Sequence, residues 1–346
     1  MPAALETPAF AAMSPKSKLA PFSIQRREPG PHDVLIDILY CGVCHSDIHQ
    51  ARDEWGGAIF PMVPGHEIIG KVVVTGSDVK KWKVGDIVDS DRTCEACKAS
   101  EEQYCEGGMT LTYNSYERDG KTPTYGGYST RIAVDENYVL RIPEGIPLER
   151  AAPLLCAGIT TYSPLKHFGL KKGDKLAVVG LGGLGHMAVK FGRAMGAHVT
   201  VLSHSPGKRD DALALGANDF LSTKDENAFK DNAGRFDFII DTVSAQHDYN
   251  AYLGLLRRDG IMVLVGVPDP TPVAAPSLIM KRRTLSGSLI GGIRETQEML
   301  DFCAEHGVAS DVEVIRIQDI NEAYERVLKS DVRYRFVIDI ASLRQT

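Results

Sequence analysis

The fold of the second half of the chain is decided by one short stretch, Gly180-Leu181-Gly182-Gly183-Leu184-Gly185. An apolar run at residues 176–179 precedes it, and apolar residues follow at the spacing of one helix face, at Leu184, Met187, Ala188, Phe191 and Met195. A second apolar run at 199–202 completes a βαβ unit, whose helix would end at Gly196 in a left-handed cap. Apolar runs at 238–240 and 261–267 extend this unit into a parallel sheet.

A glycine-rich turn between a strand and a helix favours a dinucleotide site. Glycines let the backbone approach a pyrophosphate closely, and the free N–H groups and positive dipole end of the helix then face its negative charge. Alone, such a turn is more often only a turn, but its place inside a βαβ unit favours cofactor binding. The predicted nucleotide-binding residues are Thr160, Gly180, Gly182, Gly183, Leu184, Gly185, Ser203, Ser205, Lys208 and Arg209.

The end of the second strand indicates which nucleotide is bound. A protein selective for NAD needs an acidic residue there, and this chain has Ser203. The hydroxyls of Ser203 and Ser205 and the cations Lys208 and Arg209 would bind the 2′-phosphate of NADP, so NADP(H) is the predicted cofactor. The alternative is that both cations only begin a solvated helix.

The first half has a different pattern, with short alternating strands at 34–40, 68–74, 87–88 and 128–134 separated by glycines. It predicts an irregular antiparallel β domain, to which a helix at 294–305 and a strand at 336–340 would return. The predicted fold class is therefore α/β, with a catalytic β domain at 1–152 and 290–346 and a doubly wound parallel-sheet domain at 153–289.

Composition narrows the classes of partner. The chain has 346 residues with 39 basic and 45 acidic side chains, a net charge of −6, and no basic block suited to nucleic acid or to a membrane surface. Residues 1–12 do not show a basic region followed by an apolar core, and no run of about 18 apolar residues occurs, so a cytoplasmic protein acting on small molecules is predicted. Seven clustered cysteines in a reducing compartment favour metal ligation over disulfides.

Two stretches supply candidate metal ligands, residues 41–49 with Cys44 and residues 65–67 with His66. Zinc binds thiolate and imidazole donors tetrahedrally and leaves one position open in catalytic sites. Cys156 is the candidate for the distant third ligand. Taken alone, a cysteine in so apolar a segment is more often a buried small side chain.

These stretches also carry a family resemblance. The pattern Gly65-His66-Glu67 with Gly70, Gly76 and Val79, the upstream run 42–47 and the glycine-rich turn resemble the zinc-dependent medium-chain alcohol dehydrogenases. Residues 241–244, 287–288 and 331–336 resemble the cinnamyl alcohol dehydrogenase group, and the likeness runs from about residue 15 to near the end of the chain. The implied architecture is a GroES-like catalytic domain with a Rossmann domain.

The resemblance also implies roles for individual residues. Cys44, His66 and Cys156 would hold a catalytic zinc, with Glu67 as a transient ligand, and Asp47 would accept the free ring N–H of His66. The proton would pass from Ser46 to His49 through the nicotinamide ribose. Asp47 could instead be a turn residue, and His49 an ordinary surface or core histidine.

A second metal lobe is implied at Asp91, Cys94, Cys97 and Cys105. The family has four cysteines there, and this chain has Asp91 at the first position. Asp is an accepted zinc ligand, so a structural zinc is predicted. The alternative is a lobe without metal, whose thiols are free or partly oxidised.

The predicted reaction is hydride transfer between NADP(H) and a primary alcohol or aldehyde. Trp55, Tyr113 and Leu289 would line an apolar substrate pocket suited to aromatic or medium-chain aldehydes, although each residue, taken singly, is more often core packing. The resemblance implies a homodimer or homotetramer. Two alternatives remain, a non-catalytic zinc and nucleotide binding or sensor protein and the zinc-free quinone reductase branch of the superfamily.

Overall fold

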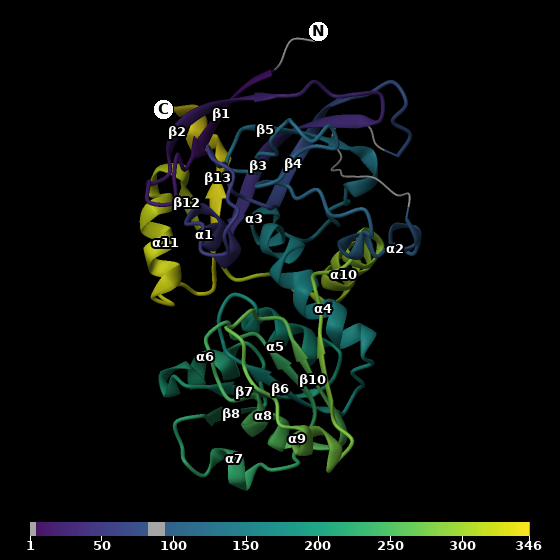
Figure 1. The fold of residues 1–346 in the computed structure, drawn as a ribbon, viewed down its shortest axis with the longest axis vertical. Coiled ribbons are helices and arrows are strands. Elements are labelled where there is room, and N and C mark those ends of the chain that lie inside the picture. The colour runs from purple at the N-terminus through teal and green to yellow at the C-terminus, as the bar shows by residue number, and fades with distance from the viewer. Residues whose placement is uncertain (1–4, 82–93, 346) are drawn as a thin grey trace. The chain divides into compact units, whose positions relative to one another are not determined.

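The computed structural model describes residues 5–81 and 94–345, which form two compact units (Figure 1). The first unit comprises Met1–Cys156 and Gly291–Thr346, and the second comprises Ala157–Ile290. Among the described residues, no helix has the length and apolar character needed to cross a membrane. The predicted α/β fold class is confirmed.

The described part of the first unit is built on a five-stranded sheet in the order β12-β13-β3-β4, with β5 also pairing with β3. Its C-terminal strand β13 runs antiparallel to β3, with Phe336 opposite Val43. A separate hairpin is formed by β1 and β2. The elements are β1 Leu5–Ala11, β2 Ala20–Arg26, β3 Asp33–Val43, α1 His45–Ala51, β4 Glu67–Thr75, α2 Glu95–Lys98, β5 Arg131–Asp135, α3 Leu148–Ala151, α10 Ile293–His306, β12 Val312–Arg316, α11 Ile320–Leu328 and β13 Arg335–Asp339.

The core of the first unit fixes the ends of β3 and β4, where the candidate metal ligands lie. Ile38, Tyr128 and Phe336 are fully or almost fully buried in one apolar cluster. Gly65, just before β4, has φ +102, and a Cβ there would come within 2.7 Å of Cys41 Sγ and of the Tyr128 ring. Only glycine fits both the conformation and the space, so the chain enters β4 in one direction.

The second unit, all of whose residues are described, contains a six-stranded parallel sheet in the order β11-β10-β9-β6-β7-β8. Counted from β6, this is the strand order 3-2-1-4-5-6 of doubly wound dinucleotide-binding folds. The elements are α4 Ala157–His167, β6 Lys175–Val179, α5 Gly185–Ala194, β7 His198–Ser203, α6 Arg209–Ala214, β8 Asp219–Ser222, α7 Ala228–Asp231, β9 Phe236–Asp241, α8 Tyr249–Leu255, β10 Leu256–Leu264, α9 Ala275–Ile279 and β11 Thr284–Gly287.

Two sequence predictions in this unit can be compared directly with the structure. Gly196 follows the end of α5 with φ +81, as predicted for a left-handed cap. The strand expected to reach residue 267 ends at Leu264 instead. The reason is local, because a Cβ at Gly266 would lie 2.4 Å from the Val243 carbonyl oxygen, so the chain leaves the sheet to pass close to that segment. The strand predicted at 87–88 lies outside the described residues.

Candidate metal centre and nucleotide-binding turn

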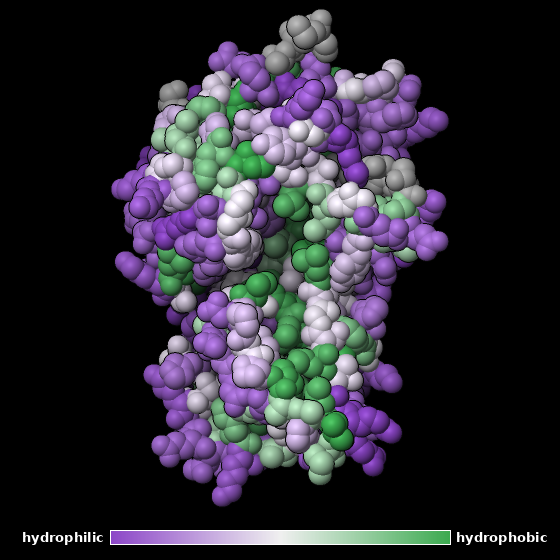
Figure 2. Space-filling view, in the orientation of Figure 1, coloured by the Kyte–Doolittle hydropathy of each residue, from purple (hydrophilic) through white to green (hydrophobic). Residues whose placement is uncertain are grey.

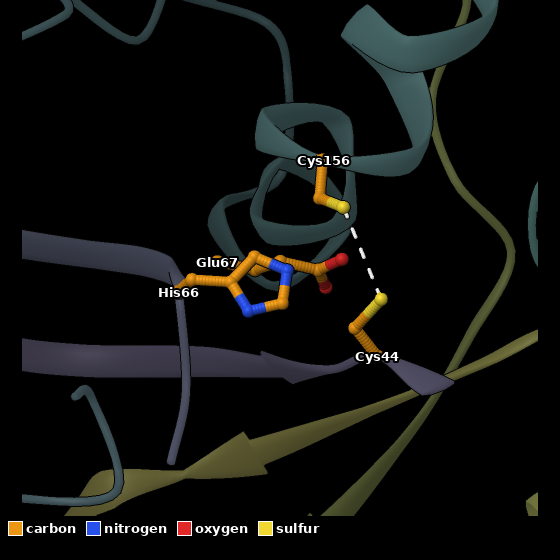
Figure 3. Close-up of side chains that lie close together, drawn as sticks. All are labelled: Cys44, His66, Glu67 and Cys156. Carbon is orange, nitrogen blue, oxygen red and sulfur yellow. Dashed lines mark hydrogen bonds between the residues drawn. The ribbon is translucent and has the colours of Figure 1, made fainter. Parts of the chain in front are cut away.

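Four potential metal donors from distant parts of the first unit converge in space (Figure 3). Cys44 is the N-cap of α1 after β3, His66 and Glu67 stand at the start of β4, and Cys156 follows a short 3₁₀ turn. One donor atom of each lies within 4.8 Å of those of the other three. The fold therefore brings together residues that lie up to 112 positions apart.

The donor set fits a tetrahedral zinc ion. The Sγ atoms of Cys44 and Cys156 are 3.9 Å apart. Two Zn–S bonds of about 2.3 Å at the tetrahedral angle require an S–S separation of about 3.8 Å. Two thiols and an imidazole with a nearby carboxylate match the soft and borderline donors that zinc prefers.

Asp47 fixes the orientation of the His66 ring. Its carboxylate is fully buried and lies 3.2 Å, through Oδ1, from His66 Nδ1. It also accepts the backbone N–H groups of Cys44 at 2.9 Å and Gly65 at 3.1 Å. Because Nδ1 is turned to Asp47, Nε2 is the nitrogen left for a metal. Burial lowers the pKa of His66, but the charge and hydrogen bond of Asp47 outweigh it, and the net pKa is raised well above its usual value.

The two thiols of the cluster differ in acidity. The hydrogen bond from Cys156 is the main reason that the pKa of Cys44 falls well below its usual value. The same contact, together with burial, raises the pKa of Cys156 well above its usual value. Cys44 is therefore the thiolate of the pair, and a cation is needed before both sulfurs can be ionised together.

Within the cluster, Glu67 forms a buried ion pair with Arg335 from β13. Arg335 Nη2 donates to Glu67 Oε1 and, at 3.0 Å, to the carbonyl oxygen of Val43. The other carboxylate oxygen, Oε2, is buried and has no hydrogen-bond partner among the described residues. Burial raises the pKa of Glu67 to about 7 against the opposing charge of Arg335. The uncompensated oxygen beside the thiols is consistent with a nearby cation.

The sequence did not predict the contacts of Arg335 and Glu54. Arg335 lies inside the 331–336 stretch, and an arginine within an otherwise apolar strand is a signal that it has a buried partner. Glu54 Oε2 is hydrogen-bonded to His49 Nδ1.

The predicted proton path begins beside the metal donors. Ser46 Oγ lies 3.6 Å from Cys44 Sγ. The His49 ring stacks between those of His45 and Trp55, each with a centroid separation of 4.9 Å. Glu54 holds Nδ1, so Nε2 of His49 is the nitrogen left to exchange a proton.

The second lobe brings Cys94, Cys97 and Cys105 together, with donor atoms within 4.8 Å of one another. Cys94 Sγ is 4.0 Å from Cys105 Sγ and accepts the Cys97 backbone N–H at 3.4 Å. This backbone hydrogen bond lowers the pKa of Cys94 to about 7. The predicted fourth ligand, Asp91, lies outside the described residues.

The glycine-rich turn lies between β6 and α5, as the motif predicts. Gly180 has φ +90, and a Cβ at Gly185 would lie 2.2 Å from the Gly180 carbonyl oxygen. Gly182, in contrast, has open space where a side chain would be, which leaves room for a ligand against the backbone. On α4, the buried hydroxyl of Thr160 has no hydrogen-bond partner within the described ranges.

The predicted phosphate-binding residues follow β7. Ser203 ends that strand, and its Oγ accepts the backbone N–H of Ser205 at 3.2 Å. Lys208 Nζ donates to the Leu181 carbonyl oxygen at 2.9 Å, so this lysine ties its loop to the glycine-rich turn. Arg209 is exposed at the start of α6. Lys208 and Arg209 thus stand at the start of α6, and Lys208 is partly buried.

The predicted substrate residues have three different environments. Tyr113 is buried, and its ring stacks on that of His66 with centroids 6.0 Å apart. Trp55 is half exposed beside His49. Leu289 is exposed in the second unit. Tyr113 is thus an apolar surface next to His66, and Trp55 is one next to His49.

Comparison with known proteins gives a consistent family. Residues 30–144 match the alcohol dehydrogenase GroES-like domain, and residues 183–305 match the zinc-binding dehydrogenase domain. The chain is 59% identical to NADP-dependent alcohol dehydrogenase C 1 of Mycolicibacterium smegmatis, over 97% of this chain and 98% of that protein. It is 54% identical to aldehyde reductase YahK of Escherichia coli, over 97% and 98% of the two chains.

Solved structures agree with these relatives. A cinnamyl alcohol dehydrogenase of Sorghum bicolor superposes with a TM-score of 0.94 at 46% identity, covering 97% of this chain and 98% of that one. The cinnamyl alcohol dehydrogenase of Helicobacter pylori in complex with NADP(H) has a TM-score of 0.91 at 43% identity, covering 98% and 99%. The chain therefore belongs to the zinc-dependent medium-chain alcohol dehydrogenases, in the cinnamyl alcohol dehydrogenase-like group, and is an oxidoreductase of alcohols and aldehydes.

Proposed function

We propose that this protein transfers hydride between NADP(H) and a primary alcohol or aldehyde with an aromatic or medium-chain apolar group. The observation that carries this proposal is the convergence of Cys44, His66 and Cys156 with a sulfur separation that suits zinc. Its relatives at 54–59% identity include NADP-dependent alcohol dehydrogenases and an aldehyde reductase. The same donor set counts against the zinc-free quinone reductase branch, and the Ser46–His49 path counts against a non-catalytic sensor.

The metal ligands and the residues around them would have different roles in the reaction. Cys44, His66 and Cys156 would hold zinc, which when bound supplies a Lewis acid that polarises the substrate oxygen. Asp47 keeps Nε2 of His66 directed at the metal position. Tyr113 and Trp55 would exclude water from the apolar part of the substrate.

Alcohol oxidation releases a proton, which Ser46 and His49 would carry. Replacing Ser46 with alanine is expected to lower kcat for alcohol oxidation by about a hundredfold near neutral pH. The loss should shrink as the pH rises, because hydroxide then takes up the proton directly. The measurement is the pH profile of kcat for Ser46→Ala and His49→Gln. His32→Gln is the control, because that histidine is exposed and pairs only weakly with Asp78 at 3.8 Å. An unchanged kcat for Ser46→Ala at every pH would remove the relay.

The second strand of the nucleotide-binding unit sets the choice of nucleotide. We expect a higher kcat/KM with NADPH than with NADH, and we expect Ser203→Asp to lower kcat/KM for NADPH by about a hundredfold or more through repulsion of the 2′-phosphate. The activity with NADH is the internal control and should be retained. The measurement is an aldehyde panel assayed with both nucleotides, before and after treatment with a chelator. A native preference for NADH would contradict the proposal.

The described residues also favour a homodimer, which could pair further into a homotetramer. The edge strand β11 has one side unpaired, and Val267, Ile279 and Met280 nearby are 69%, 73% and 77% exposed. Figure 2 shows apolar residues over the part of the second unit where Figure 1 labels α9. An open strand edge with exposed apolar side chains suits pairing with a second copy.

The molar mass of the protein, measured by light scattering during size-exclusion chromatography, tests this arrangement. The wild type should have at least twice the monomer mass, and the double variant Ile279→Glu/Met280→Glu should be a monomer because it buries charge in the contact. Leu213→Glu, at an exposed apolar position on α6, is the matched control and should keep the wild-type mass. A wild-type monomer would refute the dimer.

A further inference from the structure

A buried ion pair lies at the carboxyl end of β9 in the second unit, outside both metal clusters. Asp241 ends β9, and His247 lies in the following loop before α8. His247 Nε2 is 2.7 Å from Asp241 Oδ2, and the two side chains are 14% and 2% exposed. So short and so buried a pair is costly to assemble, and its position beside the glycine-rich turn gives it a candidate role.

The hydrogen bonds around His247 indicate its protonation state. Nδ1 is 2.7 Å from the Ala245 carbonyl oxygen, which can only accept, so Nδ1 carries a hydrogen. Nε2 faces the Asp241 carboxylate, whose other oxygen accepts the Val243 N–H at 3.1 Å. With the carboxylate ionised, every contact is satisfied when His247 is an imidazolium. In a neutral ring with its hydrogen on Nδ1, the lone pair of Nε2 would face the Asp241 carboxylate oxygen, and neither atom could donate a hydrogen bond.

The groups around His247 support this state. Burial lowers the pKa of His247, but its hydrogen bonds to Asp241 and Ala245 and the charges of Asp241 and Asp248 outweigh it, and the pKa is raised. The rings of Tyr249 and Tyr252 pack edge to face against the imidazole ring of His247, with ring centroids 5.1 and 5.2 Å apart. Burial raises the pKa of both tyrosines, so they stay uncharged.

The ion pair holds the segment that packs against the nucleotide-binding turn. Thr242 Oγ1 donates to the Val179 carbonyl oxygen at 2.8 Å. A Cβ at Gly180 would lie 2.8 Å from Val243 Cγ2 and 2.9 Å from Thr242 Oγ1. A Cβ at Gly266 would lie 2.4 Å from the Val243 carbonyl oxygen. Residues 242 and 243 therefore pack closely against both Gly180 and Gly266, and a shift of this segment would displace Gly180.

We propose that Asp241 and His247 are positioning residues for the dinucleotide site, and that tight binding of NADP(H) needs His247 in its imidazolium form. The inference rests on the proposed binding of the nucleotide at residues 180–185. A histidine whose folded pKa is raised contributes its stabilisation fully below its unfolded pKa of about 6.5, and the stabilisation is lost as the pH rises through the folded value. Affinity for NADP(H) should therefore fall as the pH rises through the pKa of His247.

The test is the Kd of NADPH, measured by fluorescence titration from about pH 6 to about pH 9, below and above the unperturbed histidine pKa. In the wild type, Kd should rise by at least about fivefold across this range. In His247→Gln it should be weak and nearly flat, while KM for the aldehyde stays unchanged. The control is His198→Gln, at an exposed position that starts β7. Any ionisation of NADPH itself affects all three proteins equally, so the difference between them is diagnostic.

A second measurement needs no variant. Because linkage is reciprocal, binding of NADPH must lower the acid dissociation constant of His247 in the wild type by the same factor, and so raise its pKa by the logarithm of that factor, which NMR of its imidazole nitrogens would report. The proposal is overturned if His247→Gln has the wild-type pH dependence of Kd, or if NADPH leaves the His247 pKa unchanged. Failure of the wild type to bind NADPH at any pH would instead refute the proposed function.

Discussion

Replacing Cys44 with serine is expected to remove one zinc ion per chain and to lower kcat/KM for aldehyde reduction by about a thousandfold or more. A serine hydroxyl stays protonated near neutral pH, so the site would keep one thiol and one imidazole, and Cys156 would lose the partner that lies 3.9 Å from it. The measurement is elemental analysis of zinc together with steady-state kinetics. Cys156→Ser should behave in the same way, because both thiols serve one ion.

The control for this experiment is Cys303→Ala. Cys303 is also buried, but it lies in α10 beside Met299 Sδ at 3.6 Å and belongs to neither thiol cluster. Its loss should leave the zinc content and kcat/KM near the wild-type values. Full zinc and full activity in Cys44→Ser would show that the donor cluster is not the metal site.

The second large effect concerns stability. Replacing Arg335 with leucine is expected to destabilise the first unit by about 3–5 kcal/mol, because it leaves the Glu67 carboxylate buried without its cation. The double variant Arg335→Leu/Glu67→Gln removes both charges and should be less destabilised than Arg335→Leu alone. The measurement is the urea dependence of unfolding, followed in the presence of zinc.

A surface pair provides the comparison for this variant. Arg141 and Asp301 lie 2.8 Å apart, with side chains 58% and 50% exposed. Arg141→Leu should therefore cost less than about 1 kcal/mol. If Arg335→Leu is no more destabilising than Arg141→Leu, the buried Arg335–Glu67 pair does not stabilise the first unit.

The features encoded locally were predictable from the sequence. The glycine-rich turn and the helix end at Gly196 depend on a few neighbouring residues whose backbone conformations only glycine adopts easily. The parallel sheet follows from apolar runs that strands buried on both faces require. The extent of β10 was predicted three residues too far, because the tight approach of Gly266 to Val243 involves two separate segments.

The long-range contacts of the site were harder to predict. Donor chemistry made Cys44, His66 and Cys156 candidate ligands, but the family resemblance implied that they share one ion, since spacing alone cannot bring together residues so far apart. Arg335 and Glu67 are 268 positions apart, and no periodicity connects them. The Asp241–His247 pair spans only six positions, yet a polar residue at the end of a strand and another in the following loop look like a solvated turn until their burial is known.

The most direct test of the account is anomalous diffraction, measured on either side of the zinc absorption edge from crystals of active enzyme. The account predicts an anomalous peak about 2.3 Å from the Sγ atoms of Cys44 and Cys156 and about 2.0–2.1 Å from His66 Nε2. Active crystals with no peak among these three atoms would contradict it.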